Sequence, residues 1–263
     1  MRLGSNLRDA LAGEMTPKFL ATVDPSGQPN CVPVISVTPY DDETLVFGEF
    51  MMNKSKRNLL YCDKVAVTLL TESMCSWSLR GRFLGFETSG DRVDFINHQQ
   101  AFRYNAYSSI RAAGVIRVEE VSEKASMGKM CILGQHAKLK TVSTFFSQAS
   151  QAENAMVRQV IEKFSRLAAV RAVAYLGEDN WPVAFISTSC RPAGKDMLLL
   201  SDSLFRVHAP HLSSGAPVAV AVLTPEPIAY QVKGFYRGLK AGIGTVDVKA
   251  CYSASPPLPG DQL

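Results

Sequence analysis

The stretch FLATVDPSGQPNCVPV, residues 19–34, has the pattern of two β-strands joined by a tight turn. Residues 19–23 are mainly apolar or β-branched, which favours a strand. In the segment 24–27, DPSG, the proline fixes φ and the glycine can adopt positive φ, as turns require. Residues 30–40 alternate in polarity and predict the returning strand. The stretch therefore predicts an antiparallel hairpin.

The same meander continues to residue 86. The next predicted elements are a turn at 41–43, strands at 44–47, 65–70 and 77–86, and a short helix at 55–62. Many short strands in succession usually close into a barrel or a sandwich.

The chain repeats itself at an offset of 153 residues, without a gap. The segment VAV at 65–67 falls on the identical segment at 218–220, and turn residues recur in the same order. Further matched pairs are Ala21 with Ala174, Pro29 with Pro182, Ser36 with Ser189, Gly81 with Gly234 and Gly85 with Gly238. A fixed period of this kind indicates an internal duplication, so a second meander is expected over residues 171–239.

An α-rich segment separates the two halves. A helix is expected over residues 90–102, and a stronger one over 149–168, because apolar residues recur there at helical spacing. Those residues are Ala152, Ala155, Met156, Val160, Phe164 and Leu167. The C-terminal tail, SASPPLPGDQL, is rich in proline and is expected to be a mobile end. The domain boundaries predicted from this organisation are 1–148 and 149–263.

Composition limits the classes of function. Apolar residues make up 46% and charged residues 20% of the 263 residues, as in ordinary globular proteins. The net charge of +4 permits an anionic ligand but does not indicate nucleic acid. No apolar run is long enough for a membrane helix, and Asp9 and Glu14 stand where a signal peptide would be apolar. We therefore expect a cytoplasmic protein with no membrane partner.

The sequence also offers little material for a metal site or for hydrolytic chemistry. The six cysteines contain no C-x-x-C pair, and there are only four histidines, so no metal site is predicted. No G-x-S-x-G, G-x-x-x-x-G-K-[ST] or H-E-x-x-H motif is present, which disfavours hydrolases and nucleotide triphosphatases.

The stretch FGEFMMNKSKRNL, residues 47–59, carries the clearest chemical signal. A strand ends at a glycine, and basic and polar residues then crowd the start of the predicted helix. The unpaired N–H groups and partial positive charge of a helix start favour phosphate, and lysine and arginine add formal charge. A phosphate site is one interpretation, and an ordinary solvated basic helix start is the other.

Four segments in fixed order carry a family resemblance: residues 19–34, 47–49, 54–59 and 64–67. Together they resemble the pyridoxamine 5′-phosphate oxidase-like, FMN-binding split-barrel family. The resemblance is close over residues 15–86 and fainter over 171–240. It implies a mainly β fold with flanking helices (α+β), in which two tandem split β-barrels form an intrachain pseudo-dimer.

The resemblance also implies an FMN site. It places Val32, Pro33 and Val34 along the isoalloxazine ring, with Gly48, Glu49 and Phe50 beside it. The phosphate would be held by Lys54, Ser55, Lys56 and Asn58. The offset of 153 puts Val207, His208, Ala209 and Pro210 on the basic cluster, so the second barrel lacks that cluster and one FMN per chain is expected.

The functional hypothesis is an FMN-binding flavoprotein that oxidises or reduces a small molecule, or is reduced by a nicotinamide donor. No catalytic side chain is assigned, because the cofactor carries such chemistry. Arg103, Tyr104 and Tyr107 are candidates for a substrate pocket, or else belong to a loop packed on the barrel. The partners expected are a small-molecule substrate or electron donor and, for the fused pair, a possible second copy of the chain.

Two alternatives remain open at the level of the sequence. The chain could be a non-catalytic FMN-carrying protein for electron transfer or ligand binding. Alternatively, the barrel could bind haem or a deazaflavin, and His208 or His211 would then be relevant to haem.

Overall fold

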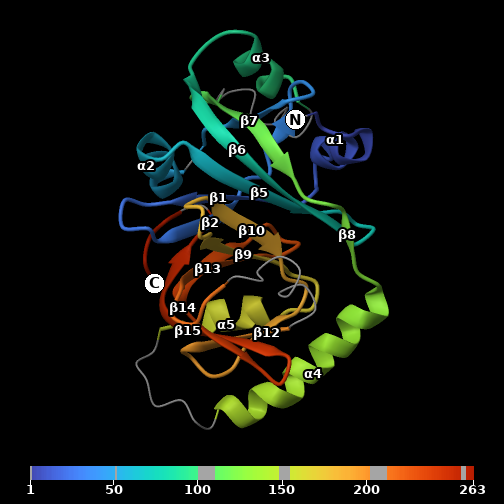
Figure 1. Cartoon of the computed structure of the whole chain (residues 1–263), viewed down its shortest axis with the longest axis vertical. Coiled ribbons are helices and arrows are strands. Elements are labelled where there is room, and N and C mark those ends of the chain that lie inside the picture. The colour runs from blue at the N-terminus through green and yellow to red at the C-terminus, as the bar shows by residue number, and fades with distance from the viewer. Residues whose placement is uncertain (1, 51, 100–109, 148–154, 202–211, 256–258) are drawn as a thin grey trace.

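Figure 1 shows a computed structural model, which describes residues 2–50, 52–99, 110–147, 155–201, 212–255 and 259–263. Two antiparallel sheets lie one above the other, the first built from the N-terminal half and the second from the C-terminal half. The first sheet contains β1 (Lys18–Val23), β2 (Pro29–Pro33), β3 (Thr38–Pro39), β4 (Thr44–Gly48), β5 (Lys64–Leu70), β6 (Cys75–Glu87), β7 (Ala113–Val121) and β8 (Ala125–Ser126). The second contains β9 (Val170–Leu176), β10 (Pro182–Ile186), β11 (Cys190–Pro192), β12 (Met197–Ser201), β13 (Pro217–Leu223), β14 (Ala229–Lys240) and β15 (Ile243–Ser253).

The two sheets have the same topology. Their strand orders are β2-β1-β5-β6-β7-β4-β3 and β10-β9-β13-β14-β15-β12-β11, with β8 added beside β6. The bounds of β2, β4 and β5 become those of β10, β12 and β13 when 153 is added to each number. The predicted fold class, mainly β with two tandem split barrels and flanking helices, is confirmed.

A helix fills each barrel at the same point of the repeat. The helices in the described residues are α1 (Ser5–Ala12), α2 (Asn53–Tyr61), α3 (Asp91–Asn97), α4 (Lys129–Ser147) and α5 (Arg158–Ser165). The bounds of α1 and α5 also differ by 153, and both helices bury apolar residues four positions apart in the barrel core. The buried residues are Leu3, Leu7 and Leu11 at the first barrel, and Met156, Val160 and Phe164 at the second.

The helix expected over residues 149–168 is shorter than predicted, and part of it lies outside the described residues. α5 ends at Ser165, and Leu167 is 46% exposed rather than packed. The buried guanidinium of Arg171 explains the end, because it donates to the carbonyl oxygens of Phe164, Arg166 and Ala169. The last carbonyls of a helix have no partner within it, and Arg171 supplies donors there; the Arg166 carbonyl also accepts from the Ala169 N–H at 3.3 Å. The predicted domain boundary at 148/149 also falls outside the described residues.

The expected strand over residues 30–40 is interrupted. β2 ends at Pro33 and β3 begins at Thr38, because the chain leaves β1 and turns to pair with β4. The Val37 N–H donates to the Val34 carbonyl at 3.1 Å, and the buried Lys18 ammonium donates to the carbonyls of Ile35 and Val37 at 3.1 and 2.9 Å. The side chain of Lys18 therefore holds this turn from inside the barrel.

α4 was not predicted, and the helix expected over residues 90–102 is α3, which ends at Asn97. Leu139 of α4 packs with Ala193 and Leu199 of the second repeat, and Val142 packs beside it. Met130 and Phe145 of α4 are 80% and 72% exposed, so its apolar residues do not form one buried face. This weak periodicity is why the helix left no clear sequence pattern. In the described part of the chain, no helix is long and apolar enough to cross a membrane.

Small side chains form the layer between the two barrels. Because alanine side chains are short, they allow the two sheets to pack closely over this layer. The buried residues of the layer include Ala21 and Ala66 from the first repeat and Ala172, Ala174, Ala184, Ala219 and Ala221 from the second. At one edge, the Trp181 ring N–H donates to the Val65 carbonyl at 3.2 Å. The two repeats therefore share a core of their own.

The C-terminal tail is not the free end that was expected. The Ser253 N–H donates to the Asp261 carbonyl at 2.9 Å, and the Leu263 N–H donates to the Cys251 carbonyl at 3.0 Å. The Gly260 N–H donates to the Ser253 carbonyl at 2.7 Å. These bonds fold the described tail residues back onto the end of β15.

Candidate functional site

A cavity of about 290 Å³ lies between the two repeats. Its volume is at the small end of the range for ligand pockets. The first repeat lines it with Asn30, Val32, Pro33, Val34, Ile35, Ser36, Gly48, Phe50, Met52, Asn53, Lys54 and Ser55. The second repeat lines it with Leu223, Pro227, Ala229, Gln231, Tyr252, Ser253, Ala254, Ser255, Pro259 and Gly260. Neither repeat encloses the cavity alone.

An edge strand forms the apolar wall of the cavity. β2 is the last strand of its sheet, so its outer edge is not paired within the sheet. The strand lies against β9, β13 and β14 of the second repeat. Val32, Pro33 and Val34 of this segment line the cavity, as do Leu223 and Ala229 from the second repeat. This combination offers apolar contact to a ligand from both barrels.

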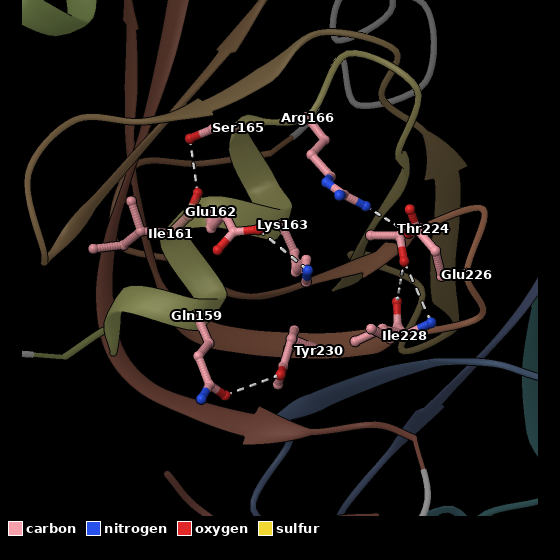
Figure 2. Close-up of polar contacts among 10 residues, drawn as sticks. All are labelled: Gln159, Ile161, Glu162, Lys163, Ser165, Arg166, Thr224, Glu226, Ile228 and Tyr230. Carbon is pink, nitrogen blue, oxygen red and sulfur yellow. Dashed lines mark hydrogen bonds and ion pairs between the residues drawn. The ribbon is translucent and has the colours of Figure 1, made fainter.

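Leu223 and Ala229 lie on either side of the turn that joins β13 to β14, and this turn is bonded to α5 and its C-terminal end. Figure 2 shows Thr224 bonded across the turn to Ile228, and the ion pair of Glu226 with Arg166. That ion pair measures 2.5 Å between Nη1 and Oε2. The Tyr230 hydroxyl also donates to Gln159 Oε1 of α5 at 3.4 Å. The turn thus keeps its place against the helix that fills the second barrel.

A glycine is needed where β4 reaches the cavity. A Cβ at Gly48 would lie 2.8 Å from a ring carbon of Phe50 and 2.9 Å from a methyl carbon of Ile110. Its N–H donates to the Ser36 hydroxyl at 3.2 Å. Gly48 therefore lets the Phe50 ring close over the strand end, and both residues line the cavity.

The start of α2 gives the cavity its basic character. Met52, the N-cap residue, makes no side-chain capping bond, so the first N–H groups of the helix have no side-chain acceptor there. Lys54 and Ser55 of the first turn line the cavity. Ser55 is buried, and its hydroxyl oxygen accepts a hydrogen bond from Asn30 Nδ2 at 3.0 Å. Because the oxygen accepts this bond, the hydroxyl proton remains available to a ligand.

The other residues predicted for the phosphate site contact the protein instead. The Lys56 ammonium pairs with the buried carboxylate of Glu49 at 2.6 Å, which joins the helix to the end of β4. Asn58 Nδ2 donates to the Thr22 hydroxyl at 3.0 Å and ties the helix to β1. Neither of these side chains, nor that of Glu49, lines the cavity. They position the helix that presents Lys54 and Ser55.

The Lys54 ammonium lies in a cationic and partly buried setting. It sits 3.5 Å from the centre of the Tyr252 ring, a cation–π contact supplied by the second repeat. Burial lowers the pKa of Lys54, and the charges of Lys233 and Arg57 lower it further. An anion bound here would relieve both the loss of water and the repulsion among these cations.

Hydrogen bonds in the wall of the cavity join the second repeat to the first. Gln231 Nε2 donates to Asn30 Oδ1 at 3.2 Å and to the Cys31 carbonyl at 2.7 Å. Because both partners are acceptors, they fix the orientation of the amide, with Oε1 directed away from them. Gln231 is 2% exposed, and its Oε1 has no hydrogen-bond partner among the described residues. This buried acceptor in the cavity lining fits a ligand that donates a hydrogen bond.

The structure thus brings seven of the ten predicted cofactor residues to one cavity: Val32, Pro33, Val34, Gly48, Phe50, Lys54 and Ser55. The sequence analysis missed Asn30 and Ser36, which lie in the same predicted strand. Gln231, Tyr252 and the tail residues were not predicted individually, because their places depend on how the second repeat packs against the first. Arg103, Tyr104, Tyr107, His208 and His211 lie outside the described residues.

Comparisons with known proteins add similarities of fold. No protein-family model matches the chain, and no curated protein matches its sequence. The chain is similar to HupZ of Group A Streptococcus, with 21% identity, a TM-score of 0.39, and coverage of 48% of this chain and 99% of HupZ. An FMN-binding protein from Syntrophomonas wolfei is 15% identical, with a TM-score of 0.40 over 46% of this chain and 85% of its own. An F420 reductase is 20% identical, with a TM-score of 0.37 over 46% of this chain and 98% of its own.

Proposed function

We propose that this chain binds one FMN molecule in the cavity between its repeats and uses it as the redox group of an oxidoreductase acting on a small molecule. The observation that supports this most strongly is the cavity lining. It combines the apolar edge of β2 with the start of α2, where Lys54 and Ser55 are presented together.

The lining matches the chemical parts of FMN. The apolar residues of β2, with Leu223 and Ala229, suit a flat aromatic ring, and the start of α2 suits a terminal phosphate. Gln231 Oε1 suits an N–H of the ring or a hydroxyl of the ribityl chain. Bound FMN would supply hydride or one-electron transfer, while these residues hold it in place and exclude water from the ring.

The same lining favours a second candidate, a non-catalytic FMN carrier for electron transfer. Among the described lining residues, the ionisable side chains are Lys54 and Tyr252, so neither a carboxylate nor a histidine is available there as an acid or base. Oxidation of a nicotinamide donor by the FMN-loaded protein, with a small-molecule acceptor, distinguishes the enzyme from the carrier. A carrier would exchange electrons with other redox centres but would not turn over such a pair.

The binding step itself is tested by titrating FMN into the protein and following the quenching of flavin fluorescence. We expect saturation at one FMN per chain, and excess inorganic phosphate alone should not abolish the binding. An absence of saturable binding by FMN would refute the proposal.

A further inference from the structure

One basic residue of the second repeat is equivalent to a basic residue of the first repeat, but only the first-repeat residue is paired with acidic side chains. Arg80 of β6 and Lys233 of β14 are equivalent at the offset of 153. Side chains two positions apart on a strand share a face, so Lys233 lies on the same face of β14 as Gln231 and Ala229. Both of those residues line the cavity. Lys233 does not itself line the cavity, but it continues the face that β14 presents there.

Two acids neutralise Arg80 in the first repeat. Its guanidinium lies 2.7 Å from the carboxylate of Asp179 and 3.5 Å from that of Glu120. Glu120 is its register partner on β7, and Asp179 belongs to the turn of the second repeat that follows β9. These two contacts account for the charge of Arg80 without any ligand.

Both acids are absent from the equivalent positions around Lys233. Its register partner on β15 is Ala250, where Arg80 has Glu120. The residue equivalent to Asp179 at the offset of 153 is Ser26, in the turn of the first repeat that follows β1. The duplicated scaffold has thus kept the cation at this site but not its two neutralising carboxylates.

Three cations and two acids act on one another around Lys54 and Lys233. Burial lowers the pKa of Lys54, the charges of Lys233 and Arg57 lower it further, and the charge of Asp261 opposes them. Asp24 is the acid that acts on Lys233, against the larger effect of burial. However, Asp24 Oδ1 already accepts bonds from the Ser26 N–H, the Ser26 hydroxyl and the Gln28 N–H, at 2.6–3.0 Å. These bonds hold Asp24 in its own turn, while its charge still acts on Lys233 and no ion pair between the two is formed among the described residues.

We infer that Lys233 is a second cation for the ligand's phosphate, so that this group is held jointly by Lys54 of the first repeat and Lys233 of the second. The inference rests on the proposed function and goes further, because it assigns direct recognition of the anionic group to a repeat that lacks the basic helix start. The ligand class is a phosphate monoester on a planar ring system, with the phosphate at the boundary between the barrels.

The test compares FMN with riboflavin, which has the same ring and ribityl chain but no phosphate. Dissociation constants for both are measured on the full-length protein, on Lys233→Met and on Lys240→Met. Lys240 lies on the same strand but is exposed, so its variant is a control with the same change of charge. We expect Lys233→Met to weaken FMN binding about tenfold, the size of one charge-assisted contact, and to leave riboflavin binding unchanged.

Each other outcome has a definite meaning. If wild-type protein binds FMN and Lys233→Met binds it equally well, the inference is wrong and the proposed function stands. If Lys233→Met weakens FMN and riboflavin to the same extent, its role is structural and the inference is likewise wrong. If wild-type protein binds neither flavin, the proposed function fails and the inference fails with it. Circular dichroism of the variants checks that each is folded.

Discussion

Two lysines near the start of α2 lie two positions apart in the sequence and have different partners. Lys54 lines the cavity and lies against the Tyr252 ring, whereas the Lys56 ammonium is paired with Glu49. Side chains two apart on a helix do not share a face, which explains the division. At the scale of single residues, the proposed function therefore places contact with the anion at Lys54.

Lys54→Ala should weaken FMN binding by about tenfold to a hundredfold, because a charged contact to phosphate is lost. Lys56→Ala should weaken it by less than about threefold, since the loss is a partly exposed ion pair outside the cavity. Isothermal titration with FMN measures both values. Equal losses in the two variants would contradict the assignment.

Gln231 offers the second test at this scale. Gln231→Leu removes the buried Oε1 acceptor, so FMN and riboflavin should both bind about tenfold more weakly. Equal losses of affinity for FMN and riboflavin would show that Gln231 contacts a part that both ligands share, and not the phosphate, which riboflavin lacks. Unchanged riboflavin binding in a folded variant would show that Oε1 does not receive a ligand hydrogen bond.

At the scale of elements, buried cations at the start of β1 and β9 hold the segments beside them. Lys18 and Arg171 are equivalent at the offset of 153, and both donate to backbone carbonyls. Lys18 secures the turn after β2, part of which lines the cavity, and Arg171 secures the end of α5. The repeat thus uses one buried position for two different structural tasks.

Arg171→Met should lower the free energy of unfolding by about 3 kcal/mol, because the carbonyls of Phe164 and Ala169 lose a buried charged donor and that of Arg166 loses one of its two donors. Arg158→Met, at an exposed position of α5, is the matched control and should change it by less than about 0.5 kcal/mol. Urea denaturation measures both. A similar small effect for the two variants would argue against the role of Arg171.

Lys18 should make stability depend on pH. Burial lowers its pKa to about 8 in the folded chain, against an ordinary value of 10.5. Between these values the unfolded chain binds more protons, so the free energy of unfolding should rise as pH increases from about 8 toward 10. Below pH 8 both states are protonated and this contribution is constant. Urea denaturation of wild type and Lys18→Met at several pH values measures the difference, and parallel pH profiles would contradict it.

Sequence reasoning succeeded where signals are local and failed where they depend on tertiary contacts. The edge strand at Val32–Val34 and the basic helix start at Lys54 follow from neighbouring residues, so both were predictable. The roles of Gln231 and Tyr252 were not, because they depend on how one barrel packs on the other. The ion pair of Lys56 with Glu49 was likewise not predictable, because the basic sequence of the helix start does not show which lysine has a carboxylate beside it.

At the scale of the whole molecule, the spacing of the two sheets sets the site. The cavity lies between the repeats, and the layer beside it is rich in alanines. Larger side chains at the alanine positions would separate the barrels and so move the second-repeat wall away from β2. Under the proposed function, the duplication therefore matters for ligand binding as well as for stability.

Ala174→Leu tests this dependence, since Ala174 is fully buried in the layer between the sheets. Overpacking should cost about 1–3 kcal/mol of stability and should also weaken FMN binding. Ala137→Leu, on the exposed side of α4, is the control and should change neither. Reduced stability with unaltered FMN affinity would show that the site does not depend on sheet spacing.

The most direct test of the central claim is the absorption spectrum of the purified full-length protein, taken together with the mass and amount of any small molecule released on denaturation. The account predicts a flavin spectrum, after purification or after addition of FMN, and the release of one FMN per chain. A protein that shows no flavin spectrum under either condition, or that releases a molecule without a phosphate, would contradict it.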